Sequence, residues 1–416
     1  MILSQKNDGS EEDTVAYIVG PSVFFFAFVI RCASAVITTF TTLNPDSRGD
    51  AVGFGNTAKA IAHGLAEGQP YLYTTGAVDI SQILIPTSSV DVYQLWGSFL
   101  APFWLLPGPS GFYARLGNAF LGAIAVYNIY LLGRHYHSPQ AGVVATLPLI
   151  FYPSIVAIHS TLLREAVILF GITTAVRLVL LPLKRCSRLV NYVLAGALLH
   201  IAVLLRDDNI LIYVSAFAAA LVIYAAQSGY VSKRQLGVGI IFTPVVAVIS
   251  YPIIRSGVKF LARTRMLRAS GRAVYLGEIV PRTVAEFVAF SWIGAAYFLY
   301  APFPWMIETI PDLLVSLEGI VTFGFTVAAL WGIRSVGKNH ASATVGPLAG
   351  LIIAVVLYGI GTANYGTAMR HRQMFIWVIF LFGGVGITEH VTFTWPFQSN
   401  SGQRSSRPDT GRPDSD

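Results

Sequence analysis

The sequence predicts an all-α integral membrane protein, a polytopic bundle of about ten transmembrane helices (about 8 to 13). Two observations predict it: 54% of the 416 residues are hydrophobic, and only 12% are charged, which is about half the charge of an ordinary soluble domain. At about 20 apolar residues per crossing helix, this composition supplies on the order of ten spans. It excludes a soluble enzyme, and residues 15–394 are expected to form a single membrane domain.

Apolar stretches mark the expected spans. The first, 15–40, follows a polar and acidic start (1–14) that lacks the basic beginning of a cleavable signal peptide. Residues 395–416 have no apolar periodicity and are expected to be disordered. The remaining stretches are 113–133, 140–158, 164–182, 189–205, 209–227, 235–254, 312–333, 343–361 and 373–390.

Lysine and arginine in the short loops predict the orientation of these spans. Basic residues recur in alternate breaks, at Arg134, at Lys184, Arg185 and Arg188, at Lys233 and Arg234, and at Arg334 and Lys338. Assigning these breaks to the cytoplasm places both termini inside and the polar loop 41–91 outside. The predicted location is the plasma (cytoplasmic) membrane, with any active site facing outward.

Within the segment 255–311, residues 255–282 carry seven basic residues and one acid, or +6 of the formal net charge of +7, and they fall on the predicted external side. Two interpretations stay open: the topology changes near residue 250, or these cations hold an anion outside the membrane. The segment ends in Tyr-Ala-Pro-Phe-Pro-Trp, which suits an interfacial or re-entrant piece. Its basic residues up to position 282 are Arg255, Lys259, Arg263, Arg265, Arg268, Arg272 and Arg282, against the single acid Glu278.

Familiar cofactor motifs are not supported. Gly53–Ala58 satisfies a GxGxxA pattern, but no buried strand precedes it and no acidic partner follows in a second strand, so a dinucleotide site is rejected. No His or Cys spacing predicts a metal site, and whether a divalent metal assists is left open. A nucleic-acid partner is not expected.

The first external loop contains the main candidate site. Asp50 precedes Phe54, Ala58 and Ile61, whose helix-like spacing predicts a short helix along the membrane surface. Either Asp50 merely caps this helix, as Asp often does, or its carboxylate is catalytic.

Other charged residues lie where spans begin or end. Glu165 heads the fourth span beside Arg164 and near His159, either in a local ion pair or as a second active-site acid. Arg31 lies within the first span, from which it can snorkel to the outer interface. Arg370 and Arg372 open the last span, either as helix-end anchors or as a phosphate grip.

The spacing from Asp50 resembles the first-loop signature of polytopic GT-C glycosyltransferases, the superfamily of the protein O-mannosyltransferases and the aminoarabinose transferases. That pattern has an acid, then an aromatic, a small residue and a glycine, here Asp50, Phe54, Ala58 and Gly64. Arg31 matches an arginine late in the first span, Glu165 matches the acid heading the fourth span, and 364–386 is similar to a late basic-headed span. The resemblance covers residues 25–182 best. The family's second acid is replaced by Ala51, and the soluble C-terminal domain of some members has no counterpart.

The resemblance implies a GT-C-like fold and an inverting glycosyltransferase that uses a lipid-linked sugar donor. Asp50 would be the general base, and the leaving group would be a dolichyl or undecaprenyl phosphate. The acceptor would be a glycan, a lipid or a protein, and membrane lipids would surround the site. Fixed cations would stabilise the departing phosphate, the candidates being Arg164, Arg370, Arg372 and the basic residues of 255–272.

Two other functions compete with this hypothesis. A polysaccharide polymerase or ligase would also use lipid-linked glycans, but through external-loop arginines instead of an aspartate base. A transporter or flippase would typically show two similar halves with helices broken at mid-membrane, and the sequence has no convincing repeat. Activity of an Asp50→Asn variant separates the first hypothesis from the polymerase.

Overall fold

The computed structural model describes residues 8–41, 49–68, 92–230, 251–252 and 254–391, and in these residues the protein is all-helical. The β-type pairing among them is an isolated antiparallel bridge between Val274 and Asn364. The predicted all-α class is therefore confirmed. Most of the expected span 235–254, and the whole expected disordered tail 395–416, lie outside the described residues.

Six of the described helices are long and apolar enough to cross a membrane. Two further helix pairs are each bent at a short break, by 72° and 66°, and would raise the count to eight if each pair is one span. The expected number of about ten is not reached in this part of the chain. The six lie in α1 (Asp8–Phe40), α5 (Ser110–Tyr136), α9 (Arg188–Leu205), η2 (Asp207–Asn209) with α10 (Ile210–Gln227), α13 (Ile310–Asn339) and α14 (Ala341–Gly361); the bent pairs are α6 (Pro139–Phe151) with α7 (Pro153–His159) and α15 (Tyr365–Arg372) with α16 (Trp377–His390).

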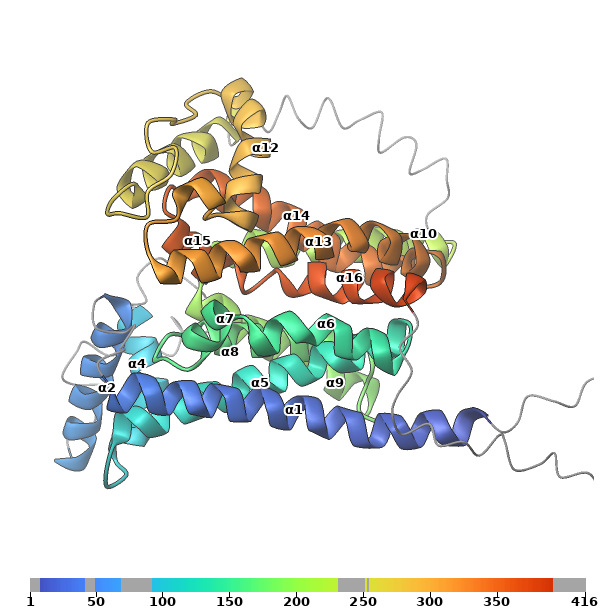
Figure 1. The fold of residues 1–416 in the computed structure, drawn as a ribbon, viewed down its shortest axis with the longest axis horizontal. Coiled ribbons are helices and arrows are strands. Elements are labelled where there is room, and N and C mark those ends of the chain that lie inside the picture. Colours follow the sequence, from blue (N-terminus) through green and yellow to red (C-terminus); the bar gives the residue numbers. More distant parts are fainter. Residues whose placement is uncertain (1–7, 42–48, 69–91, 231–250, 253, 392–416) are drawn as a thin grey trace, which may run out of the picture.

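Two expected spans differ in extent from the prediction. The stretch 164–182 forms α8 (Glu165–Leu180), whose 16 residues are short for a full crossing. The stretch 140–158 is broken at Tyr152, because Pro153 cannot donate the backbone hydrogen bond that would continue α6. α7, which follows this break, ends close to the start of α8 (Figure 1).

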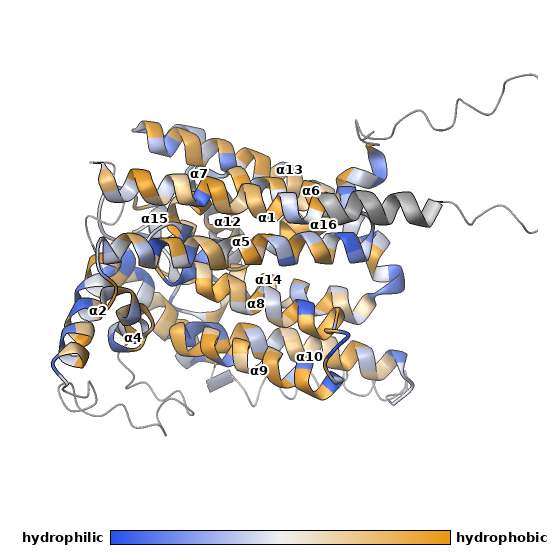
Figure 2. Cartoon of the chain, turned by 90° about the horizontal axis from the view of Figure 1, so that it is seen from below, coloured by the Kyte–Doolittle hydropathy of each residue, from blue (hydrophilic) through white to orange (hydrophobic). Residues whose placement is uncertain are grey.

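The helices form two layers that run roughly parallel to one another (Figure 1). One layer contains α1, α5, α6, α8 and α9, with contacts of α5 to α1, α6 and α8. The other contains α10, α13, α14 and α16. Apolar residues dominate these helices along their length, while hydrophilic residues gather towards the helix ends (Figure 2). This distribution is what a bundle with an apolar surround requires.

Two shorter helices lie across one end of the bundle. α2 (Asp50–Ala66) packs against α4 (Val92–Trp104), and both cross the end at which α1 stops (Figure 1). The helix predicted after Asp50 is thus confirmed. Its buried face includes Phe54, Ala58 and Ile61, the positions expected from their spacing.

Close backbone contacts of α16 join the two layers. A Cβ atom added at Gly386 would lie 2.0 Å from the carbonyl oxygen of Ala328 in α13. On the other side of α16, a Cβ at Gly384 would lie 2.7 Å from the backbone nitrogen of Ala145 in α6. Where lipid offers no hydrophobic driving force between helices, small residues permit the close packing that holds them together.

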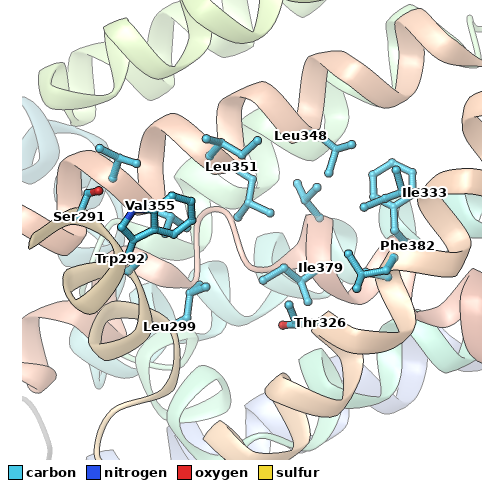
Figure 3. Close-up of a pocket in the computed structure, with 16 residues that line it drawn as sticks. Ser291, Trp292, Leu299, Thr326, Ile333, Leu348, Leu351, Val355, Ile379 and Phe382 are labelled. Carbon is cyan, nitrogen blue, oxygen red and sulfur yellow. The ribbon is translucent and has the colours of Figure 1, made fainter. Parts of the chain in front are cut away.

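An apolar cavity of about 330 Å³ lies between α13, α14, α16 and α12 (Val284–Tyr300) (Figure 3). Aliphatic side chains such as Leu348, Leu351 and Ile379 make up most of its wall, and Trp292 stands at one end. Leu299, which also lines it, is the residue whose carbonyl accepts a hydrogen bond from Arg372. The cavity therefore extends from the apolar part of the bundle towards its polar end.

The basic segment 255–282 folds as a helix over 254–268 followed by an irregular loop. Arg265 is buried in this segment and donates hydrogen bonds to five backbone carbonyls, among them those of Ile279 and Leu276. Its guanidinium also lies 4.7 Å from the ring centre of Phe290 in α12. At least one of the seven cations, Arg265, therefore stabilises the loop by binding backbone carbonyls and does not face an external anion.

The contact between α13 and α16 yields a stability prediction. We expect Gly332→Val, on α13, to lower stability by about 1–3 kcal/mol or more, because a Cβ there would lie 2.0 Å from the Phe382 carbonyl oxygen. The matched control is Gly324→Val on the same helix, where no atom lies within 4 Å of the added Cβ. The thermal midpoint of the detergent-purified protein measures both. Equal midpoints for the two variants would contradict the packing described.

Candidate functional site

Asp50 is the first residue of α2 and its carboxylate makes two long-range contacts. Gly49 precedes it with a φ of 92°, a conformation that glycine adopts without strain, and no side chain of the described residues caps the helix start. Oδ1 of Asp50 accepts a hydrogen bond of 2.8 Å from the Tyr93 hydroxyl. Oδ2 accepts one of 2.9 Å from Nη1 of Arg370. The alternative that Asp50 merely caps its helix is therefore wrong.

The packing of α2 on α4 positions this carboxylate. The rings of Phe54 and Tyr93 lie 4.7 Å apart between their centres. Gly53 leaves room for the tyrosine, because a Cβ at that position would lie 2.5 Å from the ring. The glycine that superficially suggests a nucleotide motif thus serves to bring Tyr93 to Asp50.

Asp50 is held in its ionised form. Partial burial acts to raise the pKa of this carboxyl, but the hydrogen bond from Tyr93 and the charge of Arg370 outweigh it and hold the pKa of Asp50 below its ordinary value. The Asp50 side chain is 39% exposed. A carboxylate that is both ionised and open to its surroundings can accept a proton from a bound molecule.

Glu165, the first residue of α8, is completely buried. Its Oε1 lies 3.0 Å from Nη2 of Arg370 and accepts a 3.1 Å hydrogen bond from Nε of the same side chain. Nη2 of Arg206, which follows α9, lies 3.8 Å from the same oxygen. Glu165 is thus ion-paired, both with Arg370 of α15 and with Arg206 in the break between α9 and α10, and both partners are distant in sequence.

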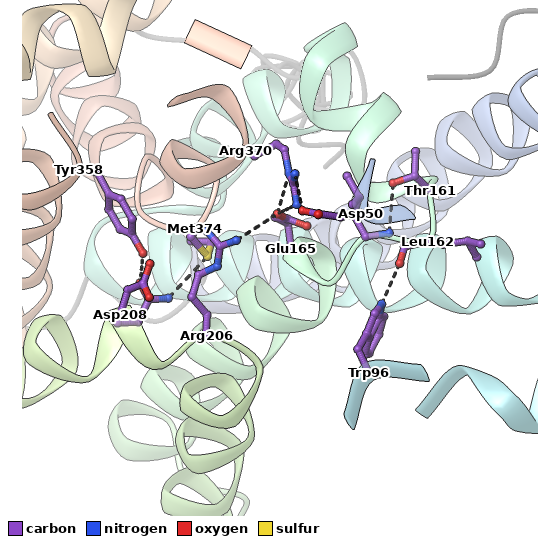
Figure 4. A network of polar contacts seen from close by, with 12 residues as sticks. Asp50, Trp96, Thr161, Leu162, Glu165, Arg206, Asp208, Tyr358, Arg370 and Met374 are labelled. Atoms are coloured by element: carbon purple, nitrogen blue, oxygen red, sulfur yellow. Dashed lines mark hydrogen bonds and ion pairs between the residues drawn. The ribbon is translucent and has the colours of Figure 1, made fainter. Parts of the chain in front are cut away.

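Arg370 is therefore shared by the two carboxylates (Figure 4). It lies in the last turn of α15, and the 66° bend between α15 and α16 lets this short helix present the side chain across the end of the bundle. The interpretation of Arg370 as an ordinary helix-end anchor is wrong. The structure brings Asp50, Glu165 and Arg370 together, and we define these three residues as the acid–arginine cluster.

Arg164 lies at the edge of the acid–arginine cluster. It directly precedes Glu165, and its guanidinium carbon lies 5.9 Å from the ring centre of Phe54. Its charge acts on Asp50 and on Glu165. Arg164 therefore adds positive charge to the site without a direct hydrogen bond to either acid among the described residues.

Arg31 and His159 form a separate buried contact. Arg31 is fully buried in α1 and donates hydrogen bonds to the carbonyls of Ala27 and Leu149. It also lies 3.3 Å from Nδ1 of His159. Snorkelling of Arg31 to the outer interface is therefore wrong: backbone carbonyls inside the bundle satisfy the cation instead. Neither residue touches the acid–arginine cluster.

Arg372, Arg272 and Arg268 also lie apart from Asp50. Arg372 is buried and donates to the carbonyls of Leu299 and Ala301. Nη1 of Arg272 lies 2.7 Å from Oδ2 of Asp312, and hydrogen bonds from Arg272 to Asp312 and Glu308 raise the pKa of its guanidinium above the ordinary value. Nη2 of Arg268 lies 3.8 Å from Asp208. Of these three, Arg268 is the one that borders the site.

Sequence reasoning missed two members of the site, Tyr93 and Arg206. Tyr93 follows a long polar segment that offers no helical pattern before it. Arg206 stands in Arg-Asp-Asp-Asn, a charged break between two apolar stretches. Three consecutive charged residues between two apolar stretches are a signal that could have identified Arg206.

Comparison with known proteins assigns this chain to no family. No family model, no curated protein and no solved structure matches it. The likeness to GT-C glycosyltransferases therefore depends on the short motifs around Asp50, Arg31, Glu165 and Arg370. The function has to be inferred from the chemistry of the site.

The burial of Glu165 yields a second prediction. We expect Glu165→Gln to lower stability by about 3–5 kcal/mol, because Arg370 and Arg206 would lose the charge that compensates them inside the protein. The control is Glu308→Gln, which removes an exposed partner of Arg272 and should change stability little. Denaturant titration of the purified protein measures both variants. Similar losses in the two would show that the buried pair is not structurally required.

Proposed function

We propose that this protein is an inverting membrane glycosyltransferase that moves a sugar from a polyprenyl-phosphate donor to an acceptor at the end of the bundle that carries α2. The observation that supports it most strongly is the state of Asp50: ionised, partly exposed, and fixed by Tyr93 and Arg370. A fixed, ionised and partly exposed carboxylate can take a proton from an acceptor as a general base. The motif resemblance supports the same class.

In the proposed reaction, Asp50 takes the proton from an acceptor hydroxyl or amine. The acceptor oxygen or nitrogen forms a bond to the anomeric carbon from the side opposite the donor phosphate. The bond between the anomeric carbon and the phosphate oxygen breaks, and the phosphate leaves with the electron pair. Attack opposite the leaving group inverts the anomeric configuration, and no other reactant is needed.

Arg370 and Glu165 have supporting roles in this mechanism. Arg370 holds Asp50 through Nη1 while its other nitrogens bind Glu165. Because Glu165 is buried and immobile in α8, it fixes the guanidinium, which in turn fixes the carboxylate. Pre-organised charges of this kind stabilise developing charge without having to reorganise during the reaction.

The apolar cavity between α12, α13, α14 and α16 supports a lipid-linked donor (Figure 3). Its aliphatic wall suits a polyprenyl chain, since burying such a chain removes apolar surface from water. Arg372 bonds to the carbonyl of Leu299 in that wall, and Arg370 lies two residues before it. A hydrogen bond thus joins the wall of the cavity to α15, the helix that also carries Arg370.

The proposed function is tested by Asp50→Asn. We expect the transfer rate to fall by about a hundred- to ten-thousand-fold, because the amide cannot act as the base. The matched control is Glu67→Gln at the other end of α2, which should leave transfer unchanged. The assay measures sugar transfer from a synthetic polyprenyl-phosphate sugar by protein in liposomes, and size-exclusion chromatography verifies folding. Near-normal transfer by a folded Asp50→Asn protein would overturn the proposal and favour a polymerase or a transporter.

A pH profile tests the state of Asp50. Asp50 can accept a proton only when it is ionised, and its pKa lies below the ordinary value. We therefore expect kcat/KM to be retained as the pH is lowered, and to fall only when the pH is below the ordinary Asp pKa of about 3.9. Tyr93→Phe removes a hydrogen bond that lowers this pKa, so its activity should be lost at a higher pH. Tyr113→Phe, which removes an exposed hydroxyl bonded to the Pro107 carbonyl, is the control. An unchanged acid limb in Tyr93→Phe would contradict the assignment.

A further inference from the structure

Arg206 is a buried cation with unused hydrogen-bonding groups. Its side chain is 6% exposed, and its contact with an acid is the 3.8 Å approach to Oε1 of Glu165. Nε and Nη1 of Arg206 have no hydrogen-bond partner among the described residues. Buried polar groups of folded proteins are almost always paired, so these two donors require an explanation.

Three further arginines lie around Arg206 and Glu165. Arg164 and Arg370 flank Glu165, and Arg268 reaches in from the helix over 254–268. The buried ring of His371 lies within electrostatic range of all four guanidinium groups. Four arginine charges are thus gathered here with four carboxylates, those of Asp50, Glu165, Asp207 and Asp208. The opposite charges are therefore equal in number, and it is the two unpaired donors of Arg206 that favour binding of a ligand with acceptor oxygens.

An unused acceptor lies beside the unused donors. Oε2 of Glu165 is buried and also has no hydrogen-bond partner in the described part of the chain, while Oε1 of the same carboxylate faces Arg206 (Figure 4). A simple inorganic anion would satisfy the donors alone. A ligand that carries anionic oxygens and hydroxyl groups together would satisfy both, and a glycosyl phosphate has this chemistry.

We propose that Arg206 and Arg268 form the binding site for the phosphate of the lipid-linked sugar, separate from the Asp50–Arg370 contact. This inference rests on the proposed function. The Nε–H and Nη1–H groups of Arg206 leave the planar guanidinium on different edges, so they can donate to different oxygens of a bound glycosyl phosphate. As the sugar leaves, the phosphate changes from a diester with one negative charge to a monoester that gains a second, and the arginines stabilise the charge that develops.

The phosphate site is tested by binding, without turnover. The probe is labelled dodecyl phosphate, a lipid phosphate monoester, added to the full-length protein in phosphatidylcholine nanodiscs, with empty nanodiscs as background. We expect Arg206→Gln to weaken binding by about tenfold or more, since it removes charge-assisted hydrogen bonds. Arg206→Lys should weaken it less than Arg206→Gln, because lysine keeps the charge and loses only the planar arrangement of donors. The matched control is Arg188→Gln, at the other end of α9, which should bind normally.

A second variant keeps the test decisive if Arg206→Gln does not fold. Arg268 is partly exposed, so Arg268→Gln should fold and also weaken binding. Unchanged binding in both folded variants would overturn the site. Competition identifies the source of the phosphate: dodecanol, inorganic phosphate and phosphatidylglycerol should each displace the probe poorly. Displacement by any of them as strong as by unlabelled dodecyl phosphate would overturn the assignment to a lipid phosphate monoester.

The outcome is separable from that of the proposed transfer reaction. Asp50→Asn should still bind dodecyl phosphate while losing transfer, since Asp50 lies outside the phosphate site. If Asp50→Asn lost transfer but Arg206→Gln and Arg268→Gln bound the probe normally, the phosphate site alone would fail. If Asp50→Asn transferred sugar normally while Arg206→Gln lost binding, the proposed base would fail and the phosphate site would survive.

Discussion

The polar end of this protein depends on one shared cation. Arg370 binds Asp50 and Glu165 together, and the three residues come from α15, from the start of α2 and from the start of α8. Buried charges are costly unless each is paired. This contact therefore fixes the start of α2, the start of α8 and the end of α15 relative to one another. Because a lone charge would be expensive in an apolar surround, the helices cannot rearrange at this end without separating the pairs.

The remaining architecture keeps these elements in place. Glycines on α16 bring its backbone against α13 on one side and α6 on the other, which fixes the helix that follows Arg370. At the far side of the cluster, Gly53 and Phe54 position Tyr93 against Asp50. Close helix packing thus positions the side chains of the acid–arginine cluster. The ion pairs of Arg370 in turn hold the ends of α2, α8 and α15 together.

Much of the fold could be predicted from composition and periodicity. The all-helical class, the helix after Asp50 and most of the apolar spans follow from local patterns that do not depend on the rest of the chain. The bends could not be located in the same way: the α15–α16 bend has no proline at its break. The contacts of the basic segment could not be predicted from the sequence either, because Arg265 and Arg272 bind carbonyls and acids that are distant in sequence.

The sequence by itself determined that this chain is a helical membrane protein, and it singled out Asp50, Glu165, Arg164 and Arg370 as unusual. Their charge, or their place at the head of a helix, is a local property and can be recognised without a structure. Only the tertiary structure decided which of the candidate charges meet: it joined Asp50 to Arg370, added Tyr93 and Arg206, and placed Arg31 and Arg372 elsewhere. The physical reason is that ion pairs between residues up to 320 positions apart depend on helix packing and bends, which no local pattern encodes.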